Sequence, residues 1–194
     1  MGPPVLLIHG GLAEDMDAER FWMLPGVLAG LRACGFVVAA PDRDTAPASW
    51  SAAADAMAAE LHGPTSVVAG SNGVSIGVRL ALQHRPLVDR LVLLWPATCG
   101  DPTVDAAMPP EVSHLLTGQT LRGMTDEELA RLDVPTAVMA SDPANPLHAV
   151  GTVDRLVALI PRATRIDVGF PEAPRPEFGP VCDSFVACLS AYHR

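Results

Sequence analysis

Ser71 occupies the position in this sequence where a chemical role is easiest to argue. It lies in the run AGSNG at positions 69–73, between an apolar segment and a helix-like segment. Small residues around a serine permit a strained turn from a strand into a helix, which lifts the hydroxyl clear of the sheet. A register one residue later would put Asn72 in the nucleophile position. That register is unfavourable, because the branched Val74 would then stand where a small residue is needed and because an amide is no nucleophile. The pattern predicts Ser71 as a nucleophile.

A nucleophilic serine needs a base, and the loop at positions 141–148 offers one. It follows an apolar segment, so His148 is expected at the same edge of the sheet as Ser71. Asp142 is the only carboxylate in this loop, and Asn145 is an alternative hydrogen-bonding partner. We therefore expect His148 to act as general base, with Asp142 orienting its ring.

Further residues are candidates for the pocket, although each also has a structural explanation. His9 and His114 could contact a ligand or simply form structural hydrogen bonds, and Trp95 and Cys99 could line the pocket or pack in the core. Glu172 and Glu177 are possible carboxylate bases, whereas the penultimate residue His193 is expected to be exposed. The remaining histidines are expected at helix ends on the surface.

Short apolar segments alternate with helical patterns along the chain, which predicts an α/β fold with a mostly parallel six-stranded sheet between two helical layers. The predicted strands are residues 5–9, 36–40, 66–70, 91–95, 136–140 and 164–168. The predicted helices are residues 19–32, 49–61, 73–84, 152–159 and 177–192. Ser49 and Thr152 are candidate N-caps.

One long connection interrupts this alternation. Residues 97–133 separate two predicted strands and contain the capping box TDEE at 125–128, which predicts a short helix. Residues 111–116 have the pattern of another helical turn. We expect a single domain over residues 1–194, in which residues 97–133 form a small lid over the carboxyl edge of the sheet; an ordinary decorated crossover is the alternative.

Five motifs in order resemble the α/β-hydrolase superfamily over nearly the whole chain. They are VLLIHGG at 5–11, the strand ending in APD at 40–42, the Ser71 elbow, RLVLLWPA at 90–97 and VPTAVM at 134–139. The resemblance implies an oxyanion hole formed by the backbone N–H groups of Gly11 and Asn72. It implies a trimmed version of the fold, without the antiparallel strands that open larger members.

The sequence departs from the family order of serine, acid and histidine. Asn145 and Pro146 stand where the family usually has Asp-Pro, and residues 169–178 contain no histidine after the last strand. We therefore expect a hydrolase-like enzyme of the esterase or thioesterase type, acting on a small, fairly apolar carbonyl compound. The alternatives are a catalytically silent protein that binds a small ligand, and a cofactor-free lyase, isomerase or cyclase.

Composition narrows the possible partners. The net charge of -9, with 13 scattered Lys and Arg residues, disfavours nucleic acid and anionic membranes. The four cysteines form no CxxC pair, so no metal site and no cofactor is predicted. The sequence has neither a signal-peptide pattern nor an apolar run long enough to span a membrane. We expect a cytoplasmic protein whose partner is a small molecule.

Overall fold

The computed structural model describes residues 2–193, and its centre is a sheet of six strands. The strands lie in the spatial order β2-β1-β3-β4-β5-β6, and every neighbouring pair is parallel. Their bounds are β1 Pro4–Ile8, β2 Val37–Ala39, β3 Thr65–Gly70, β4 Val88–Leu94, β5 Thr136–Ser141 and β6 Ala163–Phe170. The predicted α/β fold with six strands is confirmed.

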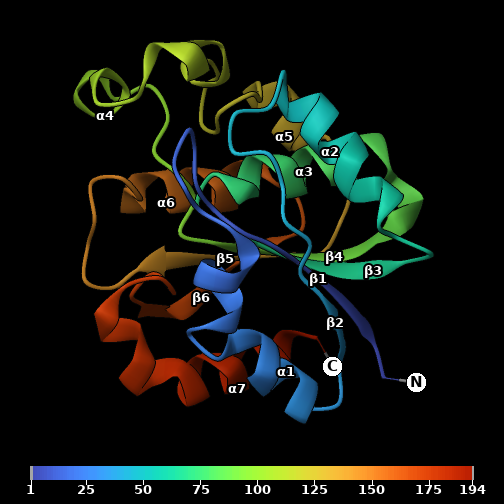
Figure 1. The fold of residues 1–194 in the computed structure, drawn as a ribbon. Helices are drawn as coiled ribbons and strands as arrows, with labels where there is room; N and C mark the ends of the chain where they lie inside the picture. The colour runs from blue at the N-terminus through green and yellow to red at the C-terminus, as the bar shows by residue number, and fades with distance from the viewer. Residues whose placement is uncertain (1, 194) are drawn as a thin grey trace.

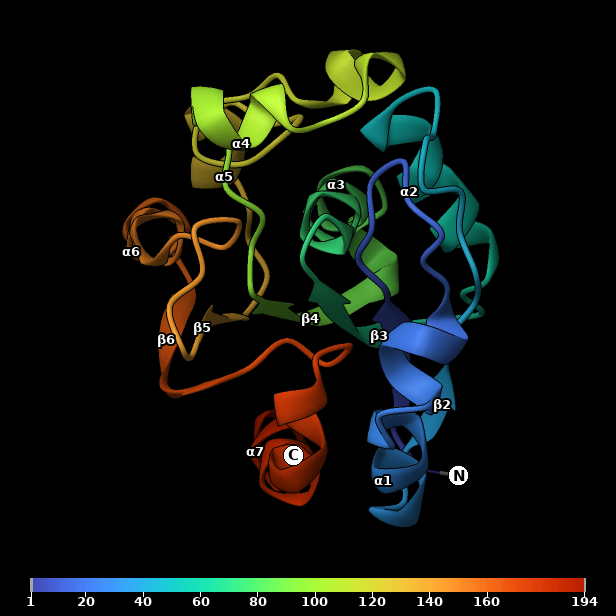
Figure 2. The same ribbon diagram turned by 60° about the vertical axis from the view of Figure 1, so that its left-hand side comes forward.

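Helices cover both faces of this sheet, as Figures 1 and 2 show. One face packs against α1 (Val27–Ala33) and α7 (Cys182–Tyr192), each preceded by a short helix, η1 (Glu19–Met23) and η4 (Pro176–Val181). The other face packs against α2 (Trp50–Ala59), α3 (Gly73–Gln83) and α6 (Val150–Leu159). Two apolar cores therefore form, because buried parallel strands present side chains to both sides.

Residues 97–133 fold as a separate excursion above the second face, at the top of Figure 1. This excursion contains α4 (Pro102–Ala106), η3 (Pro110–Leu115) and α5 (Asp126–Ala130). The predicted capping box is present, since the Thr125 hydroxyl accepts from Glu128 N–H and the Glu128 carboxylate accepts from Thr125 N–H. The remaining short element, η2 (Arg85–Leu87), leads into β4.

Three details of the helix predictions are wrong. The segment 19–32 is not one helix, because it breaks before Gly26, whose φ of 92° ends the first piece in a left-handed turn. Thr152 is not an N-cap, since α6 begins at Val150. The last predicted helix consists of η4, which ends in Pro180-Val181, followed by α7. Ser49 caps α2 as predicted, by accepting from Ala52 N–H at 3.0 Å.

His193 is buried, contrary to the expectation that it is exposed. Only 7% of the residue is accessible, and its ring packs edge-on against Phe36 with centroids 5.6 Å apart. Neither ring nitrogen has a hydrogen-bond partner in the described part of the chain. Burial, with the nearby charge of Arg90, lowers the pKa of His193 to about 4. The ring is therefore neutral in the folded protein at neutral and weakly acidic pH.

This burial predicts a loss of stability in acid. Between its ordinary pKa of 6.5 and the folded value of about 4, the unfolded chain binds a proton that folded His193 does not. The free energy of unfolding therefore decreases as the pH falls through this range, by up to about 3 kcal/mol for this residue. We expect His193→Phe to remove this part of the pH dependence in denaturant titrations between pH 8 and pH 4.5.

His62→Gln is the control, because His62 is exposed and its replacement leaves the buried cluster intact. A pH profile of His193→Phe that runs parallel to that of the wild type would show that His193 is not buried in its neutral form.

Candidate active site

Ser71 sits at the turn between β3 and α3, with the strained backbone that the sequence predicts. Its φ is 53°, and its N–H donates to the carbonyl of Leu94 at 2.9 Å. A Cβ atom on Gly73 would lie 2.5 Å from the carbonyl oxygen of His9, and one on Gly70 would lie 2.8 Å from the Phe21 ring. Glycine is thus required where the elbow helix approaches β1 so closely, and the turn holds Ser71 at the end of the strand.

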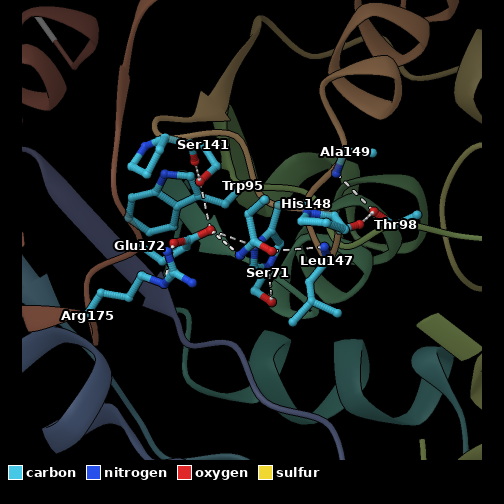
Figure 3. A network of polar contacts seen from close by, with 12 residues as sticks. Ser71, Trp95, Thr98, Ser141, Leu147, His148, Ala149, Glu172 and Arg175 are labelled. Carbon is cyan, nitrogen blue, oxygen red and sulfur yellow. Dashed lines mark hydrogen bonds and ion pairs between the residues drawn. The ribbon is translucent and has the colours of Figure 1, made fainter. Parts of the chain in front are cut away.

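His148 reaches Ser71 from the loop that follows β5. Its Nε2 lies 2.9 Å from Ser71 Oγ, which is hydrogen-bonding distance (Figure 3). Thr98 holds this loop on both sides, because its N–H donates to the carbonyl of Leu147 and its hydroxyl accepts from Ala149 N–H, both at 2.9 Å. The expected pair of Ser71 and His148 is therefore brought together in space.

The carboxylate that holds the other side of His148 is Glu172, in the loop after β6. His148 Nδ1 donates to Glu172 Oε1 at 2.8 Å, and the two side chains are only 10% and 7% exposed. The same oxygen accepts from Ser141 Oγ at 2.7 Å and from Asn145 Nδ2 at 2.8 Å. Arg175 Nε lies 3.1 Å from Oε2, the second carboxylate oxygen. Figure 3 shows Glu172 in the centre of these groups.

The environment of Glu172 keeps its carboxylate ionised. Burial disfavours the charged form, but the hydrogen bonds from His148, Asn145 and Ser141 outweigh burial and lower the pKa of Glu172 to about 2. A carboxylate with this pKa is negative across the whole pH range in which an imidazole changes its charge. It can therefore fix the orientation of the ring and stabilise an imidazolium.

Asp142 is not the partner of His148, contrary to the sequence-based expectation. Its side chain is exposed, while its backbone N–H donates to the carbonyl of Phe170 at 3.1 Å. Within residues 2–193, Asp142 makes no hydrogen bond to His148. The reason is geometric: the His148 ring faces the neighbouring loop after β6, where Glu172 already fills the position beside Nδ1.

The serine, histidine and acid therefore occur in an unexpected chain order. The resemblance implies an acid after β5 and a histidine after β6, whereas here His148 follows β5 and Glu172 follows β6. The two strands are direct neighbours, so their carboxyl ends bring the two loops together. The histidine and the acid have exchanged loops, but the hydroxyl still contacts the imidazole and the imidazole still contacts a carboxylate.

The backbone N–H groups of Gly11 and Asn72 are the oxyanion donors that the resemblance implies. Within residues 2–193, neither Gly11 N–H nor Asn72 N–H donates to a protein acceptor. The Asn72 side chain is engaged elsewhere, since its Oδ1 accepts from Arg122 Nη1 at 2.9 Å. Arg122 is 1% exposed and also contacts Asp105, with 3.2 Å between Nη2 and Oδ1. The excursion is thus attached to the residue that follows Ser71.

A cavity of about 160 Å³ opens beside Ser71 and His148. Its walls come from the loop after β1, the elbow, the excursion and the loop after β5. The other lining residues are Leu12, Glu14, Asn72, Ala97, Val104, Met108, Arg122 and Leu147. A larger hollow of about 390 Å³ beside β2 contains none of Ser71, His148 and Glu172.

The residues predicted as possible pocket members do not line this cavity. His9 is fully buried, with Nδ1 2.8 Å from the carbonyl of Gly10 and Nε2 accepting from Arg43 N–H at 3.2 Å. Burial and the charge of Arg43 lower the pKa of His9 to about 4, so it is a neutral structural residue. Asn145 contacts Glu172 instead of the cavity.

The other three candidates also serve packing or backbone contacts. His114 Nε2 lies 3.2 Å from the carbonyl of Pro47. Trp95 is fully buried, donates to the carbonyl of Phe170 at 2.8 Å and stacks on Phe185. Cys99 Sγ lies 3.7 Å from the carbonyl of Leu116, and burial raises the pKa of its thiol. Their positions support the structural explanation of each residue.

Metal-binding clusters and membrane-spanning helices are both absent from the described residues. Residues 2–193 contain no group of three or more His, Cys, Asp or Glu side chains placed to hold a metal ion. No helix in the same range has both the length and the apolar character needed to cross a bilayer.

The comparison with solved structures agrees with this architecture. No protein-family model matches the sequence, and no curated protein does so. Among solved structures, the meta-cleavage product hydrolase CumD of Pseudomonas fluorescens IP01 superposes with a TM-score of 0.70 at 18% identity, covering 98% of this chain and 92% of that one.

Two further structures give similar results. An esterase from Thermogutta terrifontis has a TM-score of 0.69 at 18% identity, with 100% of this chain and 92% of that chain covered. The serine hydrolase CCSP0084 of Cycloclasticus zankles has a TM-score of 0.69 at 16% identity, with coverage of 98% and 89%. Together with the parallel sheet and the elbow at Ser71, these similarities establish that the protein has the α/β-hydrolase fold.

Proposed function

We propose that this protein is a serine hydrolase that cleaves small carboxylic esters or thioesters. Ser71 is the nucleophile, His148 is the general base, and Glu172 is the carboxylate that orients His148. One observation carries the proposal: the continuous hydrogen-bonded path from Ser71 Oγ through His148 to Glu172, with distances of 2.9 Å and 2.8 Å. A triad of this kind is recognised by its geometry and by the role of each group, not by chain order.

The reaction begins when Ser71 Oγ attacks the carbonyl carbon of the substrate. His148 Nε2 takes the hydroxyl proton, and the ionised Glu172 stabilises the imidazolium that results. The carbonyl oxygen becomes an oxyanion, and we assign its stabilisation to the N–H groups of Gly11 and Asn72, which donate to no acceptor within residues 2–193. Collapse of this intermediate expels the alcohol or thiol, which receives the proton from His148.

The second half of the reaction releases the acid. The acyl group is now an ester of Ser71, and His148 deprotonates a water molecule that attacks the same carbonyl carbon. A second oxyanion forms and collapses, the carboxylic acid leaves, and Ser71 recovers its proton from His148. The chain's own residues supply every proton transfer in this scheme.

The cavity limits the size of the acyl group. A volume of about 160 Å³ accommodates a short acyl chain, and five of its ten lining side chains are apolar. We also propose that residues 97–133 act as a lid, since Val104, Met108 and Arg122 from this excursion form one wall of the cavity. The position of His148 beside Ser71 supports this proposal over the alternative of a silent binding protein, which rested on a missing base.

The direct test is rapid mixing of the protein with p-nitrophenyl esters of acetate, butyrate and octanoate. We expect a burst of p-nitrophenol that approaches one equivalent of enzyme, followed by slower steady turnover, because the good leaving group makes acylation of Ser71 faster than hydrolysis of the acyl-enzyme. Acetate and butyrate esters should react faster than octanoate because of the small cavity. Absence of both burst and turnover with all three esters would contradict the proposed function.

A further inference from the structure

Arg43 makes an unusual set of contacts with the loop that follows β1. Its Nε donates to the carbonyl of His9 at 3.0 Å, and its Nη2 donates to the carbonyls of Gly10 and Gly11 at 2.6 Å and 2.7 Å. A single guanidinium group thus binds the carbonyl groups of three successive residues. Arginine suits this task because its donors lie in a rigid planar fork.

These contacts fix the direction of the N–H groups in the loop. In a trans peptide, the C=O of one residue and the N–H of the next point in opposite directions within one plane. Because the carbonyls of Gly10 and Gly11 point at Arg43, the N–H groups of Gly11 and Leu12 point away from it. Within residues 2–193, neither of these N–H groups donates to a protein acceptor.

Ser71 lies next to the same loop. A Cβ atom on Gly10 would come within 2.9 Å of Ser71 Cβ, so the loop backbone passes close beside Ser71. Leu12 lines the cavity together with Ser71 and His148. The N–H groups of Gly11 and Leu12 therefore belong to a loop that borders both Ser71 and the cavity in which a substrate's carbonyl group would be attacked.

The loop that contains Arg43 is itself attached to the loop after β1 at several points. The backbone N–H of Arg43 donates to His9 Nε2 at 3.2 Å, and the carbonyl of Thr45 accepts from Ala13 N–H at 2.9 Å. Asp42 Oδ1 accepts from Ala18 N–H at 2.8 Å. Burial lowers the pKa of Arg43 to about 10, which leaves the side chain positively charged at neutral pH.

We propose that Arg43 is a positioning residue of the oxyanion hole, which acts by holding three loop carbonyls so that the N–H group of Gly11 faces the reacting oxygen together with that of Asn72. This inference rests on the proposed function and assigns one further residue to that reaction. Arg43 itself does not touch the substrate. Its loss should therefore weaken binding of the transition state much more than binding of the ester.

The test compares Arg43→Met and Arg43→Lys with Arg32→Met. Arg32 is a suitable control, because its Nη2 also donates to a backbone carbonyl, that of Val38 at 2.9 Å, but at a site away from Ser71. The measurements are kcat and KM for p-nitrophenyl butyrate, the inhibition constant of a trifluoromethyl ketone with a matching alkyl chain, and the melting temperature. The ketone forms a hemiketal with Ser71 and places an oxyanion in the hole.

For Arg43→Met we expect kcat/KM to fall by about 10²- to 10³-fold, the loss typical of one oxyanion donor. The inhibition constant of the ketone should rise by a similar factor, while KM changes by less than about threefold. Arg43→Lys should show smaller changes in both quantities, because an ammonium group retains the charge but lacks the planar fork. Arg32→Met should keep wild-type kcat and ketone affinity.

If Arg43 has a purely structural role, Arg43→Met should lower the melting temperature without a matching decrease in kcat and increase in the inhibition constant of the ketone. That result would overturn the proposal. A folded Arg43→Met with kcat within about threefold of the wild type would also overturn it. If Arg43→Met does not fold, Arg43→Lys and Arg43→Gln provide the same comparison of kcat/KM with the ketone constant. A wild-type protein that neither hydrolyses esters nor binds the ketone would instead refute the proposed function itself.

Discussion

Ser71→Ala and His148→Ala should each lower kcat for ester hydrolysis by about 10⁵-fold or more. Without Ser71 Oγ no acyl-enzyme can form, and His148 is the one side chain within residues 2–193 that hydrogen-bonds to Ser71 Oγ and could accept its proton. Members of a triad act as a unit, so the double variant should be no slower than either single variant, within about threefold. The measurement is steady-state turnover of p-nitrophenyl butyrate.

The chain offers a matched control for each of these changes. Ser75 lies one turn further along α3, and its buried hydroxyl has no hydrogen-bond partner in the described part of the chain. His114 contacts a backbone carbonyl outside the cavity. Ser75→Ala and His114→Ala should retain kcat within about threefold of the wild type. Turnover by Ser71→Ala at the rate of Ser75→Ala would mean that Ser71 is not the nucleophile.

Glu172→Gln should lower kcat by about 10²- to 10⁴-fold, whereas Asp142→Asn should leave it within about threefold of the wild type. Glutamine retains a carbonyl oxygen that can accept from His148 Nδ1, but it lacks the charge that stabilises an imidazolium. Asp142 is exposed and makes no contact with the imidazole, so its charge is screened by solvent. This pair of variants distinguishes between the carboxylate that follows β5 and the carboxylate that follows β6.

Melting temperatures must accompany these rates, because Glu172 also accepts from Ser141 and Asn145. If Asp142→Asn were the slow variant and Glu172→Gln the fast one, the assignment of the acid to Glu172 would be incorrect.

Most of the fold was predictable, because the signals that specify it are local. The strands other than β6 each contain a short apolar run, and buried parallel strands need no other pattern. The elbow was predictable for the same reason, because the small residues at 69–73 indicate that the backbone turns sharply there. Helix interruptions were missed where a single glycine or proline ends a helix within an apolar stretch, as Gly26 does.

The acid was not predictable by the same reasoning, because it depends on how two loops approach one another. Asp142 is only six residues from His148, and this proximity in sequence favoured it over Glu172, which lies 24 residues away. Sequence distance is a poor guide at the edge of a parallel sheet, where loops after adjacent strands meet. The available signal was a histidine after one strand and a glutamate after the next, in the reverse of the expected order.

The exchange has a simple physical basis. Two contacts are needed, one from Ser71 to an imidazole and one from the imidazole to a carboxylate. Because β5 and β6 are paired neighbours, the loops that follow them lie close enough for the second contact. Either loop can provide the base if the other provides the acid. Thr98 stabilises the arrangement by fixing the loop of His148 from the excursion side.

The most direct measurement is intact-mass analysis after treatment with a fluorophosphonate, which phosphonylates an activated serine. We expect the wild type to gain the mass of one phosphonyl group, with the adduct on Ser71 in peptide mapping. Ser71→Ala should gain none, His148→Ala should react at least 10²-fold more slowly, and Asp142→Asn should react like the wild type. A wild type that remains unlabelled under conditions that label a control serine hydrolase, or an adduct on another residue, would contradict the assignment of Ser71 as nucleophile.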